Sequence, residues 1–224
     1  MTKEQAFTRV KEIGIVPVVR AETSSQAIAA AEAICAGGIP IVEVTMTVPG
    51  AIEVIAQLVR SIGREVLIGA GTVLDGEAAK RCLDVGAEFL VSPGFDLETV
   101  RVAKNSNKLM LAGALTPTEV ITAWKAGSDL VKIFPCGNLG GPKYIQALRG
   151  PLPQVPLVPT GGVSLHNAGD FIRAGAVAIG VGGELVSARA LKSGNFSEIT
   201  SAAKQYLSAV REARQSNETI AVAK

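Results

Sequence analysis

The stretch "LVKIFP", residues 130–135, places a lysine in the middle of a short run of branched and aromatic residues. Such residues favour a β-strand, in which alternate side chains point to opposite faces. In a strand, Lys132 shares one face with Leu130 and Phe134. An ammonium group is costly to bury unless it is paired or gives up its proton. The position therefore predicts either a buried ion partner or a lysine with a chemical role.

Seven further apolar runs resemble this one, and segments with helical spacing of apolar residues separate them. The runs are nearly continuous and not alternating, which is typical of parallel strands covered on both faces. Several of the helical segments end in glycine, as a left-handed helix terminus requires. This order predicts an α/β fold, a parallel (β/α)8 (TIM) barrel with extra terminal helices. The eight predicted strands are 15–19, 40–45, 65–71, 88–94, 108–114, 130–135, 155–162 and 176–183.

A doubly wound open sheet is the competing architecture. It normally has a glycine-rich phosphate turn after its first strand, and "VVRAETSS", residues 18–25, has none. No linker or low-complexity segment divides the chain, so we expect one domain over residues 1–224. The polar tail "SNETIAVAK", residues 216–224, is expected to fray.

The charge balance and the cysteines exclude several classes of function. Net charge is +2, from 22 basic and 20 acidic side chains, which predicts no nucleic-acid partner and no membrane partner. No apolar stretch is long enough to span a bilayer, and the charged N-terminus does not resemble a signal peptide. Cys35, Cys82 and Cys136 are widely separated and the chain has one histidine, so we expect no metal site. These features predict a cytoplasmic protein with reduced cysteines.

Three charged residues lie at or near the predicted strand ends, where barrel enzymes carry their chemistry: Arg20, Glu43 and Lys132. Either Glu43 or Lys132 alone fits a buried structural ion pair, or a side chain that reaches the barrel mouth. Together they fit covalent catalysis by an amine, because desolvation frees an amine's lone pair and lets a carboxyl group exchange protons near neutrality. Arg20 suits bidentate binding of a carboxylate or phosphate, although a surface ion pair would also account for it.

Glycine-rich turns follow the seventh and eighth predicted strands. The first, "PTGGVS", contains Thr160, Gly161 and Gly162, and the second contains Gly182 and Gly183. Glycines let backbone N–H groups approach an anion, and barrel phosphate sites commonly combine these two loops. Ser164 is expected to cap the following helix. A simple tight turn is as good an explanation for either pair alone, but two such turns in succession indicate a phosphate site.

Six motifs occur in an order that resembles a known family: "GIVPVVR", "AGGIPIVEVT", "IGAGTV", "FLVSPG", "LVKIFP" and "VPTGG". Over roughly residues 10–190 the chain is similar to the bacterial aldolases that act on 2-keto-3-deoxy-6-phosphogluconate (KDPG) and 4-hydroxy-2-oxoglutarate (KHG). The resemblance implies a class I aldolase, a lyase that forms pyruvate and an aldehyde from a 2-oxo acid. It also implies a homotrimer with no metal or organic cofactor.

The resemblance assigns roles to positions of this sequence. Lys132 matches the Schiff-base lysine and Glu43 the general acid and base. The matches around the substrate are Arg20 and Thr72 at the carboxylate and keto-acid end, Pro93 and Phe134 along the pocket, and Thr160, Gly161 and Gly162 at the phosphate turn.

Two positions depart from part of the family. Thr47 stands where some members carry arginine, and Gly183 stands where a serine is common. Without that serine a phosphate loses one hydroxyl donor; a hydrogen bond to a charged group is worth about 1.5–3 kcal/mol. A weaker preference for a phosphorylated tail follows. Two alternatives stay open: another phosphate-binding barrel enzyme, such as an isomerase or a thiamin-phosphate-synthase-like transferase, and a non-catalytic oligomeric scaffold.

Overall fold

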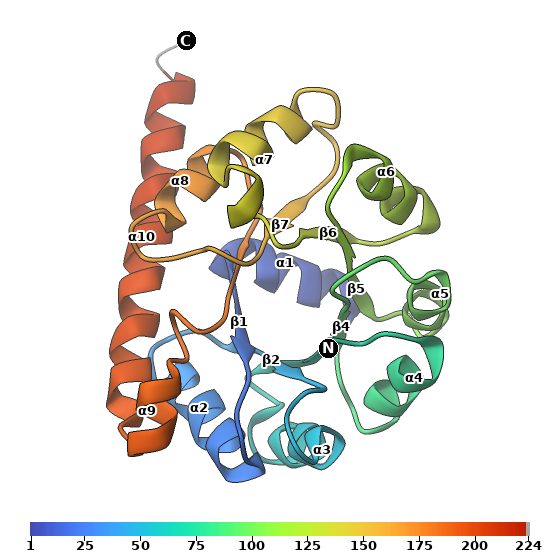
Figure 1. Cartoon of the computed structure of the whole chain (residues 1–224), viewed down its shortest axis with the longest axis vertical. Helices are drawn as coiled ribbons and strands as arrows, with labels where there is room; N and C mark the ends of the chain where they lie inside the picture. The colour runs from blue at the N-terminus through green and yellow to red at the C-terminus, as the bar shows by residue number, and fades with distance from the viewer. Residues whose placement is uncertain (223–224) are drawn as a thin grey trace.

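A computed structural model describes the backbone of residues 1–222 and the side chains of residues 1–216. Its centre is a ring of eight parallel strands (Figure 1), in the order β7-β6-β5-β4-β3-β2-β1-β8. The strands are β1 Ile15–Val19, β2 Ile41–Thr45, β3 Leu67–Gly71, β4 Phe89–Val91, β5 Leu109–Ala114, β6 Leu130–Ile133, β7 Leu157–Pro159 and β8 Ile179–Val181.

Each predicted run contains one of these strands, so the barrel is confirmed. The sequential strand order, with β8 beside β1 and a bridge from β7 back to β8, excludes the open doubly wound sheet. One isolated bridge, between Thr160 and Gly180, joins β7 and β8. We call the β7–β8 contact the seam, because every other pair of neighbouring strands forms a regular ladder.

Every strand residue is buried, which explains why the runs are continuous. One face meets the packed barrel interior and the other meets the surrounding helices. Phe89 fills part of the interior: its ring occupies the space that a side chain at Gly69, its register partner on β3, would need.

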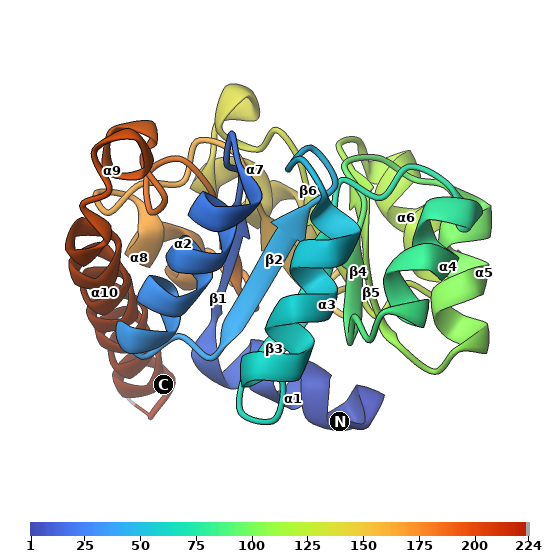
Figure 2. The same cartoon turned by 90° about the horizontal axis from the view of Figure 1, so that it is seen from below.

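Helices alternate with the strands and cover the ring from outside (Figures 1 and 2). Gly38, Gly86, Gly127 and Gly175, which follow four predicted helices, adopt left-handed conformations as expected. The helices are α1 Lys3–Ile13, α2 Ser24–Ala36, α3 Ala51–Ile62, α4 Gly76–Asp84, α5 Leu97–Asn105, α6 Pro117–Ala126, α7 Pro142–Arg149, α8 Ala168–Arg173, α9 Ala188–Ser193 and α10 Phe196–Val222, with a 3-10 turn, η1, at Gly137–Leu139.

The extra terminal helices occupy two different places. Helix α1 lies across the amino-terminal end of the ring, and α10 runs along the outside against α2 and α8 (Figure 2). Arg214 of α10 connects the two ends of the chain, because its guanidinium donates to the carbonyl groups of Lys11, Glu12 and Val177. The predicted fraying of 216–224 concerns in part residues 223–224, which lie outside the described residues; the α10 backbone is helical to Val222.

Among the described residues, no helix is long and apolar enough to cross a membrane.

Candidate active site

The residues predicted from the sequence gather at the carboxyl ends of the strands. Arg20 directly follows β1, Thr72 follows β3, and Pro93 lies two residues after β4. Lys132 is the third residue of β6 and Glu43 the third of β2. Phe134 follows β6 directly. The remaining predicted positions lie on the turns after β7 and β8: Thr160, Gly161, Gly162, Gly182 and Gly183.

Glu43 is buried inside the ring with a relative exposure of 2%. Strand register places it level with Val18 of β1 and Gly69 of β3. Its carboxyl group lies across Gly71, where an added Cβ would overlap Oε1. Oε1 has no hydrogen-bond partner, although a buried carboxylate oxygen normally has one. The site thus holds a carboxyl group with one free oxygen.

Burial raises the pKa of the Glu43 carboxyl above its ordinary value, because desolvation disfavours the charged form. The positive charges of Lys132 and Arg20 oppose this effect in part. A carboxyl group with a raised pKa can both take up and release a proton nearer to neutral pH. Glu43 is therefore suited to general acid and base chemistry.

Lys132 is also buried, with a relative exposure of 4%. It lies between Gly113 of β5 and Val158 of β7 in the register. Its Nζ is 5.3 Å from the centroid of the Phe134 ring, two residues further along the chain. Among the described residues it forms no hydrogen bond, and no ion pair within 4.0 Å. In the part of the chain that the structure describes, Lys132 therefore forms no buried structural ion pair of the kind that the sequence left open, although its charge acts on Glu43 from a distance.

A cavity of about 130 Å³ is formed at the strand ends of β1, β6, β7 and β8, and we call it the site cavity. Seven of the predicted residues line it, whereas Glu43 and Lys132 are not part of its lining. Phe134 belongs to the lining and also contacts the Lys132 amine, so it connects the cavity to the buried pair. The seven are Arg20, Phe134, Thr160, Gly161, Gly162, Gly182 and Gly183.

Thr72 and Pro93 do not line the site cavity, but both have unusual surroundings. Thr72 has a left-handed backbone with φ of 57°, which is uncommon for a residue other than glycine and often occurs at functional sites. The Pro93 backbone lies so close to Gly113 that an added Cβ there would overlap it. Because Gly113 is the register partner of Lys132, Pro93 is held beside the reactive strand.

The expected cap at Ser164 is wrong. Helix α8 begins at Ala168, and Asn167 precedes it. The Ser164 N–H donates to Asn167 Oδ1 at 2.8 Å, and its carbonyl accepts the N–H of Ala168 at 2.9 Å. Ser164 begins a turn before the helix, because three residues separate it from the first helical residue.

Thr47, one of the two departures, is bound to the strand end nearby. Its hydroxyl lies 2.7 Å from that of Thr45, which also donates to the Val19 carbonyl at 3.1 Å. In residues 1–216 no group of three or more His, Cys, Asp and Glu side chains could hold a metal.

Sequence reasoning gave no role to several residues of the site. Gly71 makes room for Glu43 and Gly113 makes room for Pro93. Four further residues line the site cavity: Val18, Val163, Gly180 and Glu184. The glycines in "IGAG" and "LAGA" could have indicated this crowding, because glycine inside a strand often marks a close approach of another group. The sequence does not show which group approaches.

Comparison with known proteins decides the family. The family described as KDPG and KHG aldolase matches residues 7–202. The chain belongs to this family. A KDPG and KHG aldolase relative, the 2-dehydro-3-deoxy-phosphogluconate aldolase of Treponema pallidum, is 35% identical over 204 residues, which cover 91% of this chain and 97% of that protein.

Two solved structures show the same fold at 30% identity. One is the KDPG aldolase of Legionella pneumophila with pyruvate captured as a covalent carbinolamine intermediate; its TM-score is 0.83, over 89% of this chain and 97% of that one. The other is a cube-shaped protein cage designed by fusing symmetric oligomeric domains, with a TM-score of 0.85 over 93% of this chain and 76% of the cage chain.

Proposed function

We propose that this chain is a class I aldolase that cleaves a 4-hydroxy-2-oxo acid, such as KDPG or KHG, to pyruvate and an aldehyde. The observation that carries the proposal is the buried Lys132 amine, which has no hydrogen bond or ion pair in the described chain and lies in the same ring as the Glu43 carboxyl group. The covalent pyruvate adduct of the Legionella pneumophila relative supports the same chemistry.

The first half of the reaction forms an imine. The neutral Lys132 amine attacks the C2 ketone of the substrate to give a carbinolamine. Glu43 supplies the proton with which the carbinolamine hydroxyl leaves as water, and the product is a protonated imine. Phe134 keeps water away from the amine on one side.

The second half breaks the C3–C4 bond. Glu43 takes the proton of the C4 hydroxyl, the C3–C4 electron pair moves toward the imine nitrogen, and the aldehyde leaves. The remaining enamine takes a proton at C3, and water hydrolyses the new imine to pyruvate and free Lys132. The protons balance, so the reaction needs no oxidant or reductant.

The other predicted residues hold the substrate in this proposal. Arg20 and Thr72 bind its carboxylate and keto-acid end, and Pro93 and Phe134 shape the pocket around C2 and C3. The turns after β7 and β8 receive the aldehyde half through Thr160, Gly161, Gly162, Gly182 and Gly183.

We also propose a homotrimer, because the family resemblance implies one and the cage relative is built from symmetric oligomeric domains. A cytoplasmic location fits the three free cysteines Cys35, Cys82 and Cys136, since disulfides are rare where thiols are kept reduced. No observation favours the other barrel enzymes or the inactive scaffold, because neither requires a buried lysine and glutamate in one ring.

The decisive experiment is trapping with pyruvate and borohydride. Reduction of the imine should add mass irreversibly to wild-type protein at Lys132 alone, as peptide mass spectrometry would show. Lys132→Ala should lose both the adduct and pyruvate release. Labelling at another residue, or no labelling with active enzyme, would end the Schiff-base proposal.

A further inference from the structure

A second cavity adjoins the site cavity at the mouth of the barrel. Its volume is about 370 Å³, whereas the site cavity, at about 130 Å³, is below the range of about 300–1,000 Å³ that is usual for small-molecule sites. The second cavity lies between the loop after β1 and the α9 segment, and we call it the outer cavity. Val18, Arg20 and Gly183 line both cavities, so a substrate too long for the site cavity continues past these residues into the outer cavity.

The two cavities differ in the charged residues that line them. The site cavity is lined by one basic residue, Arg20, and by one acidic residue, Glu184. The outer cavity is lined by two basic residues, Arg20 and Lys192, and by one acidic residue, Glu22. Of the two spaces, the outer cavity is therefore the more favourable one for an anionic group.

The Lys192 ammonium can exchange its present partner for a ligand. It forms an ion pair with the Glu22 carboxylate at 3.5 Å, and the two side chains are 66% and 71% exposed. Ion pairs as exposed as this one contribute little to stability, so breaking one costs little. A phosphate group carries about two negative charges where Glu22 carries one, and it can therefore replace Glu22 as the partner of Lys192.

The boundary between the two cavities also offers backbone donors. Within residues 1–216, the N–H groups of Gly183 and Glu184 donate to no other group. An added Cβ at Gly183 would meet no atom within 4 Å, so the space beside these donors is open. The serine hydroxyl that part of the family carries at this position is absent, and Lys192 is a cation near enough to offset its loss.

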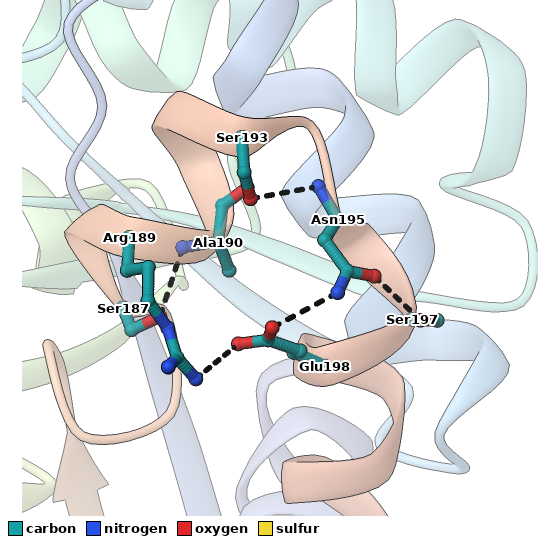
Figure 3. A network of polar contacts seen from close by, with 7 residues as sticks. All are labelled: Ser187, Arg189, Ala190, Ser193, Asn195, Ser197 and Glu198. Carbon is teal, nitrogen blue, oxygen red and sulfur yellow. Dashed lines mark hydrogen bonds and ion pairs between the residues drawn. The ribbon is translucent and has the colours of Figure 1, made fainter.

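The backbone that carries Lys192 is held in place before any ligand binds (Figure 3). Glu198 of α10 accepts hydrogen bonds from Arg189 at 2.8 Å and from Asn195 at 2.9 Å. Lys192 lies between these two residues in the chain, and Ser187 caps the helix at its other end. The α9 segment is thus fixed to the start of α10, and only the lysine side chain needs to be ordered when a ligand enters.

From this geometry we infer that Lys192 is a specificity-determining residue, which binds the phosphate of a long aldehyde half, such as that of KDPG, in the outer cavity. The inference rests on the proposed aldolase function and adds a residue to its substrate recognition. The reacting carbons bind beside Lys132, and the chain passes Gly183 so that its phosphate meets Lys192. The second carboxylate of KHG is attached directly to C4, so it stays in the site cavity and does not meet Lys192.

The test compares pyruvate release from KDPG, from KHG and from the KDPG carbon chain without its phosphate. Lys192→Met should lower kcat/KM for KDPG by about five- to tenfold, the scale of one ion pair or charged hydrogen bond at a partly open site. The same variant should keep the wild-type kcat/KM for KHG and for the unphosphorylated chain. No loss with KDPG, or an equal loss with all three substrates, would overturn the inference alone. If wild-type protein releases pyruvate from none of them, the proposed aldolase function fails, and the inference fails with it.

Two further variants separate a local contact from an effect of net charge. Lys204 is exposed on α10 and lines neither cavity, so Lys204→Met removes the same charge elsewhere and should keep the wild-type ratio of kcat/KM for KDPG to that for the unphosphorylated chain. Glu22→Gln should raise this ratio, because it removes the carboxylate that competes for Lys192.

An equal fall of the ratio in Lys192→Met and Lys204→Met, or a fall in Glu22→Gln, would contradict the inference. Lys192 also lies in the last turn of α9, where a cation stabilises the helix end. Comparing two substrates on the same variant removes any such effect on folding from the measurement.

Discussion

At the scale of single residues, the two buried charged groups of the ring differ in how they are held. Within residues 1–216, Glu43 has one carboxyl oxygen without a hydrogen bond and a raised pKa, whereas Lys132 lies over an aromatic ring and has no polar partner. Burying such groups unpaired costs stability, and proteins retain this cost mainly where chemistry needs it. The pair is therefore better explained by reactivity than by structure.

Glu43→Gln tests the acid and base role. The amide cannot exchange protons, so kcat should fall by at least about 10², the scale of general acid–base catalysis. Borohydride trapping with pyruvate at Lys132 is the control. An adduct that still forms in the variant shows that the ligand still binds and that only turnover is slower. Full turnover in this variant would assign the proton transfers to another group.

The raised pKa of Glu43 predicts that the free energy of unfolding depends on pH, and the same variant tests this. The folded pKa of Glu43 is raised above the ordinary 4.5, so the folded wild type binds the proton more tightly than the unfolded chain does. Its stabilising contribution is complete below pH 4.5 and is lost as pH rises through the folded pKa. Glu43→Gln has no such loss, so its free energy of unfolding, measured in urea, should increase relative to wild type from pH 4.5 upward. A constant difference across that range would contradict the raised pKa.

At the scale of elements, two glycines in the strands leave room for groups from a neighbouring element. The carboxyl group from β2 lies over a glycine of β3, and the loop after β4 lies over Gly113 of β5. Each glycine is thus required by a residue on an adjacent element. Gly71 is a positioning residue, since it acts on the reaction through Glu43.

Gly71→Ala should displace Glu43, because the added methyl group overlaps its carboxyl oxygen. We expect kcat to fall more than about tenfold and stability to fall by about 1–3 kcal/mol, as overpacking usually costs. The pH profile of kcat should also shift, which a general loss of stability would not produce. Gly150→Ala is the matched control, because its Cβ has only an ordinary contact at 3.5 Å. An unshifted profile in Gly71→Ala would contradict the positioning role.

The sequence predicted strands and strand ends well because both depend on local patterns. Continuous apolar runs marked all eight strands, and Lys132 stood out inside one of them. Contacts across the ring could not be predicted in this way, because strand register decides that Glu43 meets Gly71 and that the Pro93 loop meets Gly113.

At the scale of the whole molecule, the strands of the ring are not all paired to the same extent. Seven neighbouring pairs form ladders, while the seam between β7 and β8 has a single bridge at Thr160 and Gly180. Helix α10 packs on α8 and α2, which lie on either side of this part of the barrel (Figure 1). The outer helix thus packs on the helices beside the seam and on β1, the strand that follows β8 around the ring.

The assembly proposed above gives a prediction at this scale. The chain mass is 23.1 kDa, and light scattering of the purified protein should show one species of three times that mass. The mass should stay constant on dilution through the concentrations used for assays. A species of 23.1 kDa at those concentrations would rule out the homotrimer.

The weakly bonded seam has a consequence for binding. Thr160 to Gly162 stand on one side of it and Gly180 to Gly183 on the other, and both edges border the site cavity. The backbone joins these edges by the Thr160–Gly180 bridge and, at their other end, by the hydrogen bond from the Val177 N–H to the Leu157 carbonyl at 3.0 Å. A substrate bound there would therefore add contacts across the pair of strands that share the fewest backbone hydrogen bonds.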